Sequence, residues 1–287
     1  MMNSQQFSKY LELLDHPIQL PLNADVSSLY YLYRQHITRF SYQSLDLWLG
    51  KPIVNLSISA LLQDLSLHGG HCYQHSELMF AALEYVGFEV HRIPAWVLMN
   101  REYQEWMPLN HIFIQVRIGQ DFYICDPGLA SASPRFPVKF KMDKSEEITI
   151  SEGEHYKLEV QDKYYNLFWM LKESWLLLYR FARNISTGLP KTSKREDTLE
   201  MCKCLYECPE YIPIRDKYVK ISRQTDDSRL DFYYSAGSYI FRKYQRGEKT
   251  KELKDMESVE FFQLIKELCS LEFEISSIPP KELKMNI

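Results

Sequence analysis

Three residues have side chains that could together carry out covalent acyl transfer: Cys72, His111 and Asp126. A cysteine nucleophile needs a base to take its proton, and the base needs an acceptor that orients it. Cys72 follows Gly69-Gly70 and opens a segment with helical periodicity. At the first turn of a helix, backbone N–H groups and the helix dipole lower a thiol pKa and can bind an oxyanion. Taken alone, Cys72 could equally be a small buried residue at a helix start.

The sequence around His111 and Asp126 predicts that both side chains lie on one face of a β-hairpin. Gly119-Gln120 has the glycine-first pattern of a two-residue type II′ turn, which pairs Ile118 with Asp121. In that register His111 lies diagonal to Asp126, about 7 to 8 Å away between Cα atoms. A three-residue loop would swap the faces and separate the two side chains. Each residue alone is more typical of a structural role, but together with the cysteine they predict a catalytic triad.

Hydrophobic periodicity predicts the elements that would position these residues. Apolar residues recur at three and four through residues 7–86, which indicates amphipathic helices, and the clearest helix spans 72–86 before a C-capping Gly87. After Gly87 the period changes to two, most regularly in 111–118. Further short strands are expected at 136–140, 147–150, 156–160 and 165–170. This pattern favours a small barrel or sandwich after a helical region.

The last third of the chain predicts a separate unit of mixed strands and helix. Residues 191–197 form a polar, charged connector and a plausible boundary. Strand patterns follow at 218–221, 230–234 and 239–241, and an amphipathic helix at 258–268. The sequence thus predicts an α+β fold with domains at 1–90, 91–190 and 191–287.

Bulk composition excludes several classes of protein. The 287 residues carry 34 basic and 38 acidic side chains, a net charge of -4, so no surface for nucleic acid is expected. The six cysteines do not form the dense framework of a small secreted domain, and we expect reduced thiols in the cytoplasm. No membrane association is predicted, because the longest apolar run, 164–181, is interrupted by charges and suits a buried strand pair or helix.

The three candidate residues lie in the motifs His68-Gly-Gly-His-Cys72-Tyr-Gln74, Pro108-Leu-Asn-His111 and Tyr123-Ile-Cys-Asp126-Pro-Gly128. These motifs resemble the three catalytic motifs of the arylamine N-acetyltransferases. The spacings of 39 residues from Cys72 to His111 and 15 from His111 to Asp126 also match that family. Residues 36–46, 50–53 and 178–181 are similar to further family segments, and the stretch from 260 to Phe273 resembles its closing helix and strand.

The resemblance implies a fold and a reaction. The family has a helical bundle, a central β-barrel and a C-terminal α/β lid around a cysteine-protease-like Cys-His-Asp core. It implies that Cys72 accepts an acetyl group from acetyl-CoA, that His111 takes the thiol proton and that Asp126 orients the imidazole. A small-molecule amine, such as an arylamine or hydrazine, would then take the acetyl group in a ping-pong reaction. Val97, Gly128 and Leu129 would line the substrate pocket, and no metal is implied.

Departures from the family pattern concern the substrate. His68 replaces an arginine, residues 41–45 are less charged, and Leu129 and Ala130 replace an aromatic residue and a glycine. An amide synthase or cysteine hydrolase with the same triad and a different acyl donor is therefore an alternative, as is a binding protein that retains the triad without activity.

Two other groups of side chains could suggest zinc. His68, His71, Cys72 and His75 lie within eight residues, and Cys202, Cys204 and Cys208 form a second group. Neither spacing fits a recognised zinc site, and neither has a partner motif. We therefore expect no metal, and expect the second group to be buried or surface thiols.

Overall fold

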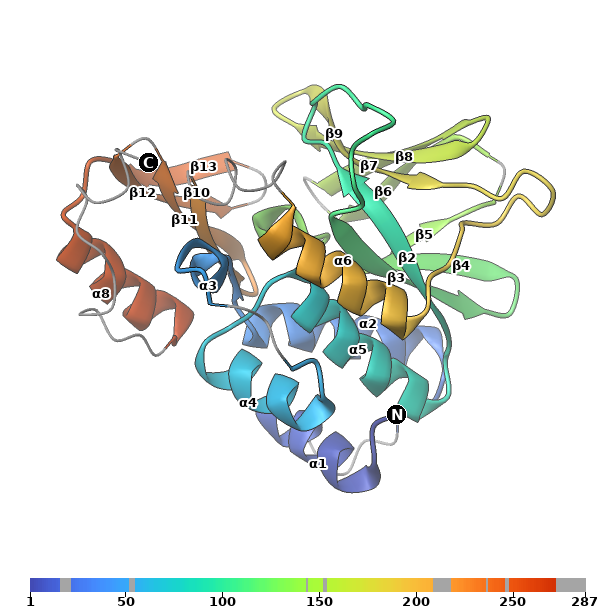
Figure 1. Ribbon diagram of the computed structural model, residues 1–287, viewed down its shortest axis with the longest axis horizontal. Coiled ribbons are helices and arrows are strands. Elements are labelled where there is room, and N and C mark those ends of the chain that lie inside the picture. The colour runs from blue at the N-terminus through green and yellow to red at the C-terminus, as the bar shows by residue number, and fades with distance from the viewer. Residues whose placement is uncertain are drawn as a thin grey trace.

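The computed structural model describes residues 1–15, 22–51, 55–142, 144–151, 154–208, 218–235, 237–245 and 248–271. Figure 1 shows a group of helices, a strongly curled sheet above them, and a smaller sheet flanked by one helix at the other side. The strand predicted near Phe273 lies outside the described residues.

The first third is helical, as predicted. Its longer helices are α1 (Ser4–Leu13), α2 (Val26–Arg39), α4 (Ile58–Leu67) and α5 (Cys72–Val86). A side-chain cap begins each of them: Asn3 caps α1, Asp25 caps α2, Ser57 caps α4 and His71 caps α5. Their apolar faces form one buried cluster that also includes residues of the neighbouring strands, so the helices pack directly against the sheet.

Helix α5 has the predicted limits and occupies the centre of the molecule. Gly87 ends it with φ +100°, a left-handed conformation that favours glycine. Residues 72–83 are all buried, because α5 lies between the other helices and strands β2 (Glu89–Val97) and β3 (His111–Ile118). The first residue of α5 is therefore held between two layers of the fold.

The middle of the chain forms a nearly closed barrel. In the described part of the chain, eight strands pair in the order β5-β4-β3-β2-β9-β8-β7-β6, and β5 also contacts β6. The strands beyond β3 are β4 (Asp121–Cys125), β5 (Val138–Phe140), β6 (Glu146–Ser151), β7 (Glu154–Gln161), β8 (Tyr164–Leu171) and β9 (Ser174–Ala182). The long apolar run is thus a strand pair that turns at Lys172 and Glu173, both with positive φ. The barrel prediction is confirmed.

A second sheet forms the last third of the molecule. Its order is β1-β10-β11-β12-β13, with β1 (Tyr42–Gln43) contributed by the first third. The other strands are β10 (Tyr218–Gln224), β11 (Ser228–Ser235), β12 (Ser238–Gln245) and β13 (Glu248–Leu253). The short helix α3 (Leu45–Trp48) and the predicted final helix α8 (Ser258–Cys269) pack on it. The domain boundaries remain predictions, and β1 ties the first unit to the third.

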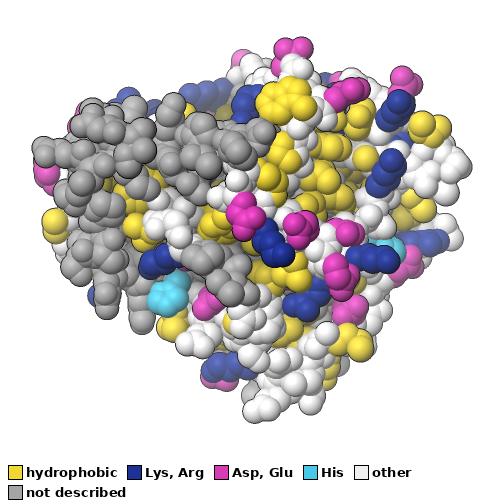
Figure 2. Space-filling model, viewed as in Figure 1, with side chains coloured by type: hydrophobic (Ala, Val, Ile, Leu, Met, Phe, Trp, Pro, Cys, Tyr) yellow, Lys and Arg dark blue, Asp and Glu magenta, His cyan; other side chains and the backbone are white. Residues whose placement is uncertain are grey.

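The prediction of a polar connector at 191–197 is partly wrong, because a helix starts within it. Helix α6 (Arg195–Glu207) begins after Lys194, and Glu196 and Asp197 form its acidic first turn. Acidic residues at this position stabilise a helix N-terminus, so the charged stretch marks a helix start. In Figure 1, α6 runs along α5, above it in the view, and Figure 2 shows acidic and basic side chains side by side over this region.

Candidate active site

The two glycines before Cys72 are held by strand β1. The N–H of Gly70 donates to the Ser41 carbonyl at 3.1 Å, and its own carbonyl accepts from the N–H of Gln43 at 2.8 Å. Gly69 has φ +70°, and a Cβ atom added there would lie 2.5 Å from the Ser41 carbonyl oxygen. Glycine is therefore needed at 69, and this contact fixes the start of α5.

Cys72 is a free thiol, 6% exposed, at the first residue of α5. Burial raises its pKa, and nearby Cys202 and Asp126 raise it further, whereas the backbone N–H groups of Tyr73 and Cys72 lower it. The expectation of a lowered thiol pKa is therefore wrong in its net direction. The helix start acts as predicted, but desolvation of the charged thiolate is the larger effect. At neutral pH this cysteine needs a base.

His111 and Asp126 form a buried hydrogen bond, as the register predicted. Ile118 pairs with Asp121, and Gly119 has the positive φ of +61° that the turn requires. The Nε2 atom of His111 lies 2.8 Å from Oδ2 of Asp126, and both side chains are buried. Because the carboxylate accepts, Nε2 donates, which leaves Nδ1 of the neutral ring as a proton acceptor.

The turn that follows Asp126 lies against the cysteine. The N–H of Gly128 donates to Oδ1 of Asp126 at 3.2 Å. A Cβ atom added to Gly128 would lie 2.5 Å from the Cα atom of Cys72 and 2.9 Å from its carbonyl oxygen. Only glycine allows this approach. The structure thus brings Asp126 together with His111, and the Asp126 turn together with Cys72.

The two other predicted pocket residues lie on the barrel side of this turn. Leu129 is buried in the apolar cluster that fills the barrel, and the half-buried Val97, at the end of β2, packs against the same cluster. The N–H of Leu129 donates to Oγ of Ser133 at 2.8 Å. Both residues therefore contact the apolar interior of the barrel.

Three residues near the site were not predicted from the sequence. The hydroxyl of Tyr33 donates to the carbonyl of Asp126 at 2.9 Å and to that of Pro134 at 2.8 Å. The Tyr179 ring lies 5.7 Å from the His111 ring. Cys202 of α6 belongs to one small buried cluster with Cys72 and Tyr73. Tyr33 was visible only as part of a helical stripe, and nothing in its spacing indicates a contact 93 residues along the chain.

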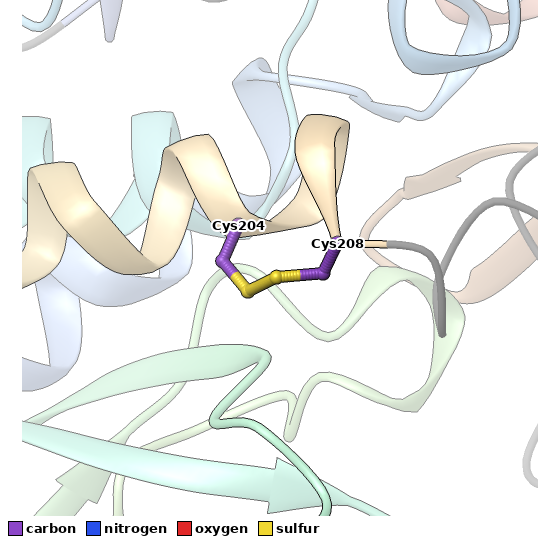
Figure 3. The surroundings of a disulfide bond; sticks show 2 residues. All are labelled: Cys204 and Cys208. Atoms are coloured by element: carbon purple, nitrogen blue, oxygen red, sulfur yellow. A yellow bond between two sulfur atoms is a disulfide. The ribbon is translucent and has the colours of Figure 1, made fainter.

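The cysteines of α6 differ from the prediction of thiols. Cys204 and Cys208 form a disulfide at the C-terminal end of the helix (Figure 3), with 5.0 Å between their Cα atoms. Residues four apart on a helix lie on the same face, so the spacing itself allows this bond. Cys202 remains a buried free thiol, and burial raises its pKa to about 12.

The histidines around Cys72 have structural partners. Nδ1 of His71 accepts from the N–H of Tyr73 at 3.2 Å and so caps α5, which leaves that N–H engaged and not available for an oxyanion. Burial lowers the pKa of His71 to about 3 and that of His75 to about 4. Among the residues that the structure describes, no group of three or more His, Cys, Asp or Glu side chains could hold a metal ion.

The less charged segment before α3 also has its own contacts. Nε2 of Gln43 donates to Oδ2 of Asp46 at 2.7 Å, and Oε1 accepts from the Asp46 N–H at 3.1 Å. The hydroxyl of Ser41 donates to the Cys269 carbonyl at 3.1 Å. The Ser41 hydroxyl thus joins the first third to the last, whereas the Gln43 side chain bonds within the first third.

Comparison with known sequences identifies a family. A profile described as N-acetyltransferase matches residues 25–278. An arylamine N-acetyltransferase of Mycolicibacterium smegmatis is 26% identical over 163 residues, which cover 55% of this chain and 58% of the relative. One of Mycobacterium tuberculosis H37Rv is 28% identical over 152 residues, 51% of this chain and 53% of the relative. The chain thus matches just over half the length of these curated relatives.

Solved structures show the same fold. The arylamine N-acetyltransferase of Salmonella typhimurium superposes with a TM-score of 0.79 at 18% identity, over 96% of this chain and 97% of that chain. A Mycobacterium marinum arylamine N-acetyltransferase in complex with CoA gives a TM-score of 0.80 at 19% identity, over the same shares of the two chains. No helix among the described residues is long and apolar enough to cross a membrane. The chain belongs to the arylamine N-acetyltransferase family, a family of enzymes.

Proposed function

We propose that this protein transfers an acetyl group from acetyl-CoA to the nitrogen of a small amine through a thioester on Cys72. The observation that carries the proposal is the buried bond between His111 and Asp126, on a turn whose Gly128 lies against Cys72. The CoA complex of the M. marinum relative supports the choice of donor.

In the first half-reaction His111 acts as the base. Nδ1 of His111 takes the Cys72 proton, and the sulfur attacks the acetyl carbonyl of the donor. The negative charge of Asp126 stabilises the imidazolium that forms, which offsets the burial that keeps the thiol protonated. The imidazolium then returns its proton to the departing CoA sulfur, leaving acetyl-Cys72.

In the second half-reaction the same histidine serves the acceptor. His111 takes a proton from the amine nitrogen as that nitrogen attacks the thioester carbonyl, and Cys72 leaves and regains its proton. We propose that Val97, Gly128 and Leu129 bound the acceptor site. Leu129 is smaller than the aromatic residue usual in the family and is packed into the barrel wall, which supports a wider acceptor pocket.

Intact-protein mass spectrometry tests this function. After mixing with acetyl-CoA, we expect one acetyl group on the wild-type chain and on Cys202→Ala, and none on Cys72→Ala. Addition of an arylamine or hydrazine should remove the group and yield the acetylated amine. If no adduct forms from acetyl-CoA while iodoacetamide still alkylates Cys72, the donor assignment is wrong. If the adduct disappears equally fast without amine, water is the acceptor and the enzyme is a hydrolase.

A further inference from the structure

A buried charged group lies behind the Asp126 turn and has no part in the proposed chemistry. Arg229 of β11 and Glu154 of β7 are each only 4% exposed. The Arg229 guanidinium donates to Glu154 through Nη2 and lies 4.9 Å from the Trp169 ring. Glu154 also accepts from Arg135, with Nε at 3.1 Å. A buried ion pair of this kind costs desolvation energy, so its contacts require an explanation.

The other terminal nitrogen of Arg229, Nη1, bonds the segment that follows the Asp126 turn. Nη1 donates to the carbonyl of Ser131 and, at 2.9 Å, to that of Ser133. The side chain of Gln224, on the neighbouring strand β10, donates to the same Ser133 carbonyl at 2.7 Å. Lys220 donates to Oγ of Ser131 at 3.0 Å. Side chains of β10 and β11 thus hydrogen-bond to the carbonyls of Ser131 and Ser133, which follow the Asp126 turn.

Both ends of the same segment are held from the helical layer. Tyr33 of α2 bonds the carbonyls of Asp126 and Pro134, the two ends of the loop. Within the loop, Leu129 bonds Ser133. The segment from 126 to 134 is therefore held at its two ends by α2, and at Ser131 and Ser133 by the C-terminal sheet. Gly128, which touches Cys72, lies between these anchors.

We propose that Arg229 is a positioning residue, which holds the 129–133 segment so that Gly128 stays against Cys72 and Asp126 stays aligned with His111. This inference rests on the proposed function. The planar fork of arginine suits the task, because one nitrogen pairs with Glu154 while the other bonds two carbonyls. The C-terminal sheet thereby acts on the catalytic residues through the 129–133 segment.

Arg135 provides a matched control, because it shares the acid but not the turn carbonyls. Its Nε atom pairs with Glu154, and its Nη1 atom donates to the carbonyls of Thr225 and Asp226 at 3.4 and 3.0 Å. Replacing either arginine by lysine keeps the positive charge and removes the fork. Only Arg229→Lys should loosen the catalytic turn.

The experiment measures the alkylation rate of Cys72 by iodoacetamide from about pH 6 to about pH 9, the melting temperature, and the acetylation rate from acetyl-CoA. A misplacement of about 1 Å in a catalytic group can cost about 100-fold, so we expect Arg229→Lys to lower acetylation about 10- to 100-fold. Its alkylation profile should move to higher pH. Arg135→Lys should lose similar thermal stability and keep the wild-type profile.

Other outcomes would overturn the proposal. Equal melting temperatures with identical alkylation profiles in the two variants would reduce Arg229 to a structural role. If Arg229→Lys does not fold, Gln224→Met removes a single contact with the Ser133 carbonyl and should shift the profile in the same direction by a smaller amount; no shift would contradict the proposal. Alkylation needs no acyl donor, so a wrong donor assignment would leave this test intact.

Discussion

Buried histidines occur in two hydrogen-bonded groups, His111 with Asp126 and His75 with His36, and the partners of the two groups differ. His111 of β3 bonds the carboxylate of Asp126 at 2.8 Å. His75 of α5 bonds His36 of α2 at 3.2 Å, and His36 in turn bonds the hydroxyl of Tyr10 at 3.0 Å. Nε2 of His75 lies 3.2 Å from the Ser41 carbonyl. The first group ends on an acid, and the second runs from a phenol to a backbone carbonyl.

The partner decides whether a buried histidine can take a proton. The Ser41 carbonyl can only accept, so His75 donates through Nε2 and accepts from His36, which accepts from Tyr10. Each ring nitrogen of His36 and His75 therefore has a hydrogen-bond partner while both rings are neutral. Burial accordingly lowers the pKa of His75 to about 4, and that of His36 well below its ordinary value. His111 differs in its partner, because its Nε2 atom donates to the carboxylate of Asp126.

The largest expected effect comes from removing that carboxylate. Asp126→Asn should lower kcat by roughly 10³- to 10⁴-fold, because the amide can hold the wrong tautomer and cannot stabilise an imidazolium. Asp121→Asn, on the same hairpin but exposed and paired with Lys139, is the control and should change kcat less than about twofold. Steady-state acetylation of an arylamine measures both. Equal activity of the two variants would remove the distinction between the histidine groups.

The second prediction concerns stability in acid. The folded-state pKa of His75 lies below that of the unfolded chain, so the unfolded state binds the proton more readily. The stability that the folded state gains from keeping His75 neutral is fully present above about pH 6.5 and is lost as the pH falls towards about 4. For His75 this amounts to roughly 3 kcal/mol of unfolding free energy.

Urea denaturation at a series of pH values measures this loss. His75→Gln should flatten the decline in the free energy of unfolding between about pH 6.5 and about pH 4. His155→Gln, an exposed histidine on β7, should leave the decline unchanged. If the free energy of unfolding falls equally steeply with pH in wild type and His75→Gln, the buried Tyr10–His36–His75 hydrogen bonds do not govern acid sensitivity.

The smallest expected effect comes from removing the hydroxyl of Tyr10, which donates to His36. Tyr10→Phe leaves Nδ1 of His36 without its donor and should cost about 1 to 2 kcal/mol of stability, with unchanged kcat. Tyr85→Phe, a half-exposed ring that stacks on Phe7, is the control for loss of a hydroxyl. A fall in kcat for Tyr10→Phe would instead show that the Tyr10–His36–His75 hydrogen bonds contribute to catalysis.

Local rules predicted the half of the site that lies within one hairpin and one helix start. The Gly119 turn sets the register between His111 and Asp126, and the Gly69-Gly70 pair precedes the helix that begins at Cys72. Both depend on residues close in sequence. The disulfide between Cys204 and Cys208 was not predicted, although the four-residue spacing on a helix is local information that allows it.

Features that depend on tertiary packing could not be predicted in this way. The net rise in the Cys72 pKa comes from burial beneath elements distant in sequence. Arg229 reaches the Ser131 carbonyl across 98 residues, and His36 reaches His75 across 39. Helix α6 was missed because its charged start resembles a linker. No spacing within a single element encodes these contacts.

The most direct test of the difference between the two histidine groups is the pH dependence of Cys72 alkylation in wild type, Asp126→Asn and His75→Gln. The reaction reports proton transfer from the thiol and requires no acyl donor. We predict that Asp126→Asn reacts much more slowly at neutral pH and that its profile moves to higher pH, while His75→Gln keeps the wild-type profile. A wild-type profile for Asp126→Asn, or an equal shift in His75→Gln, would contradict the assignment of His111 and Asp126 as the pair that activates Cys72.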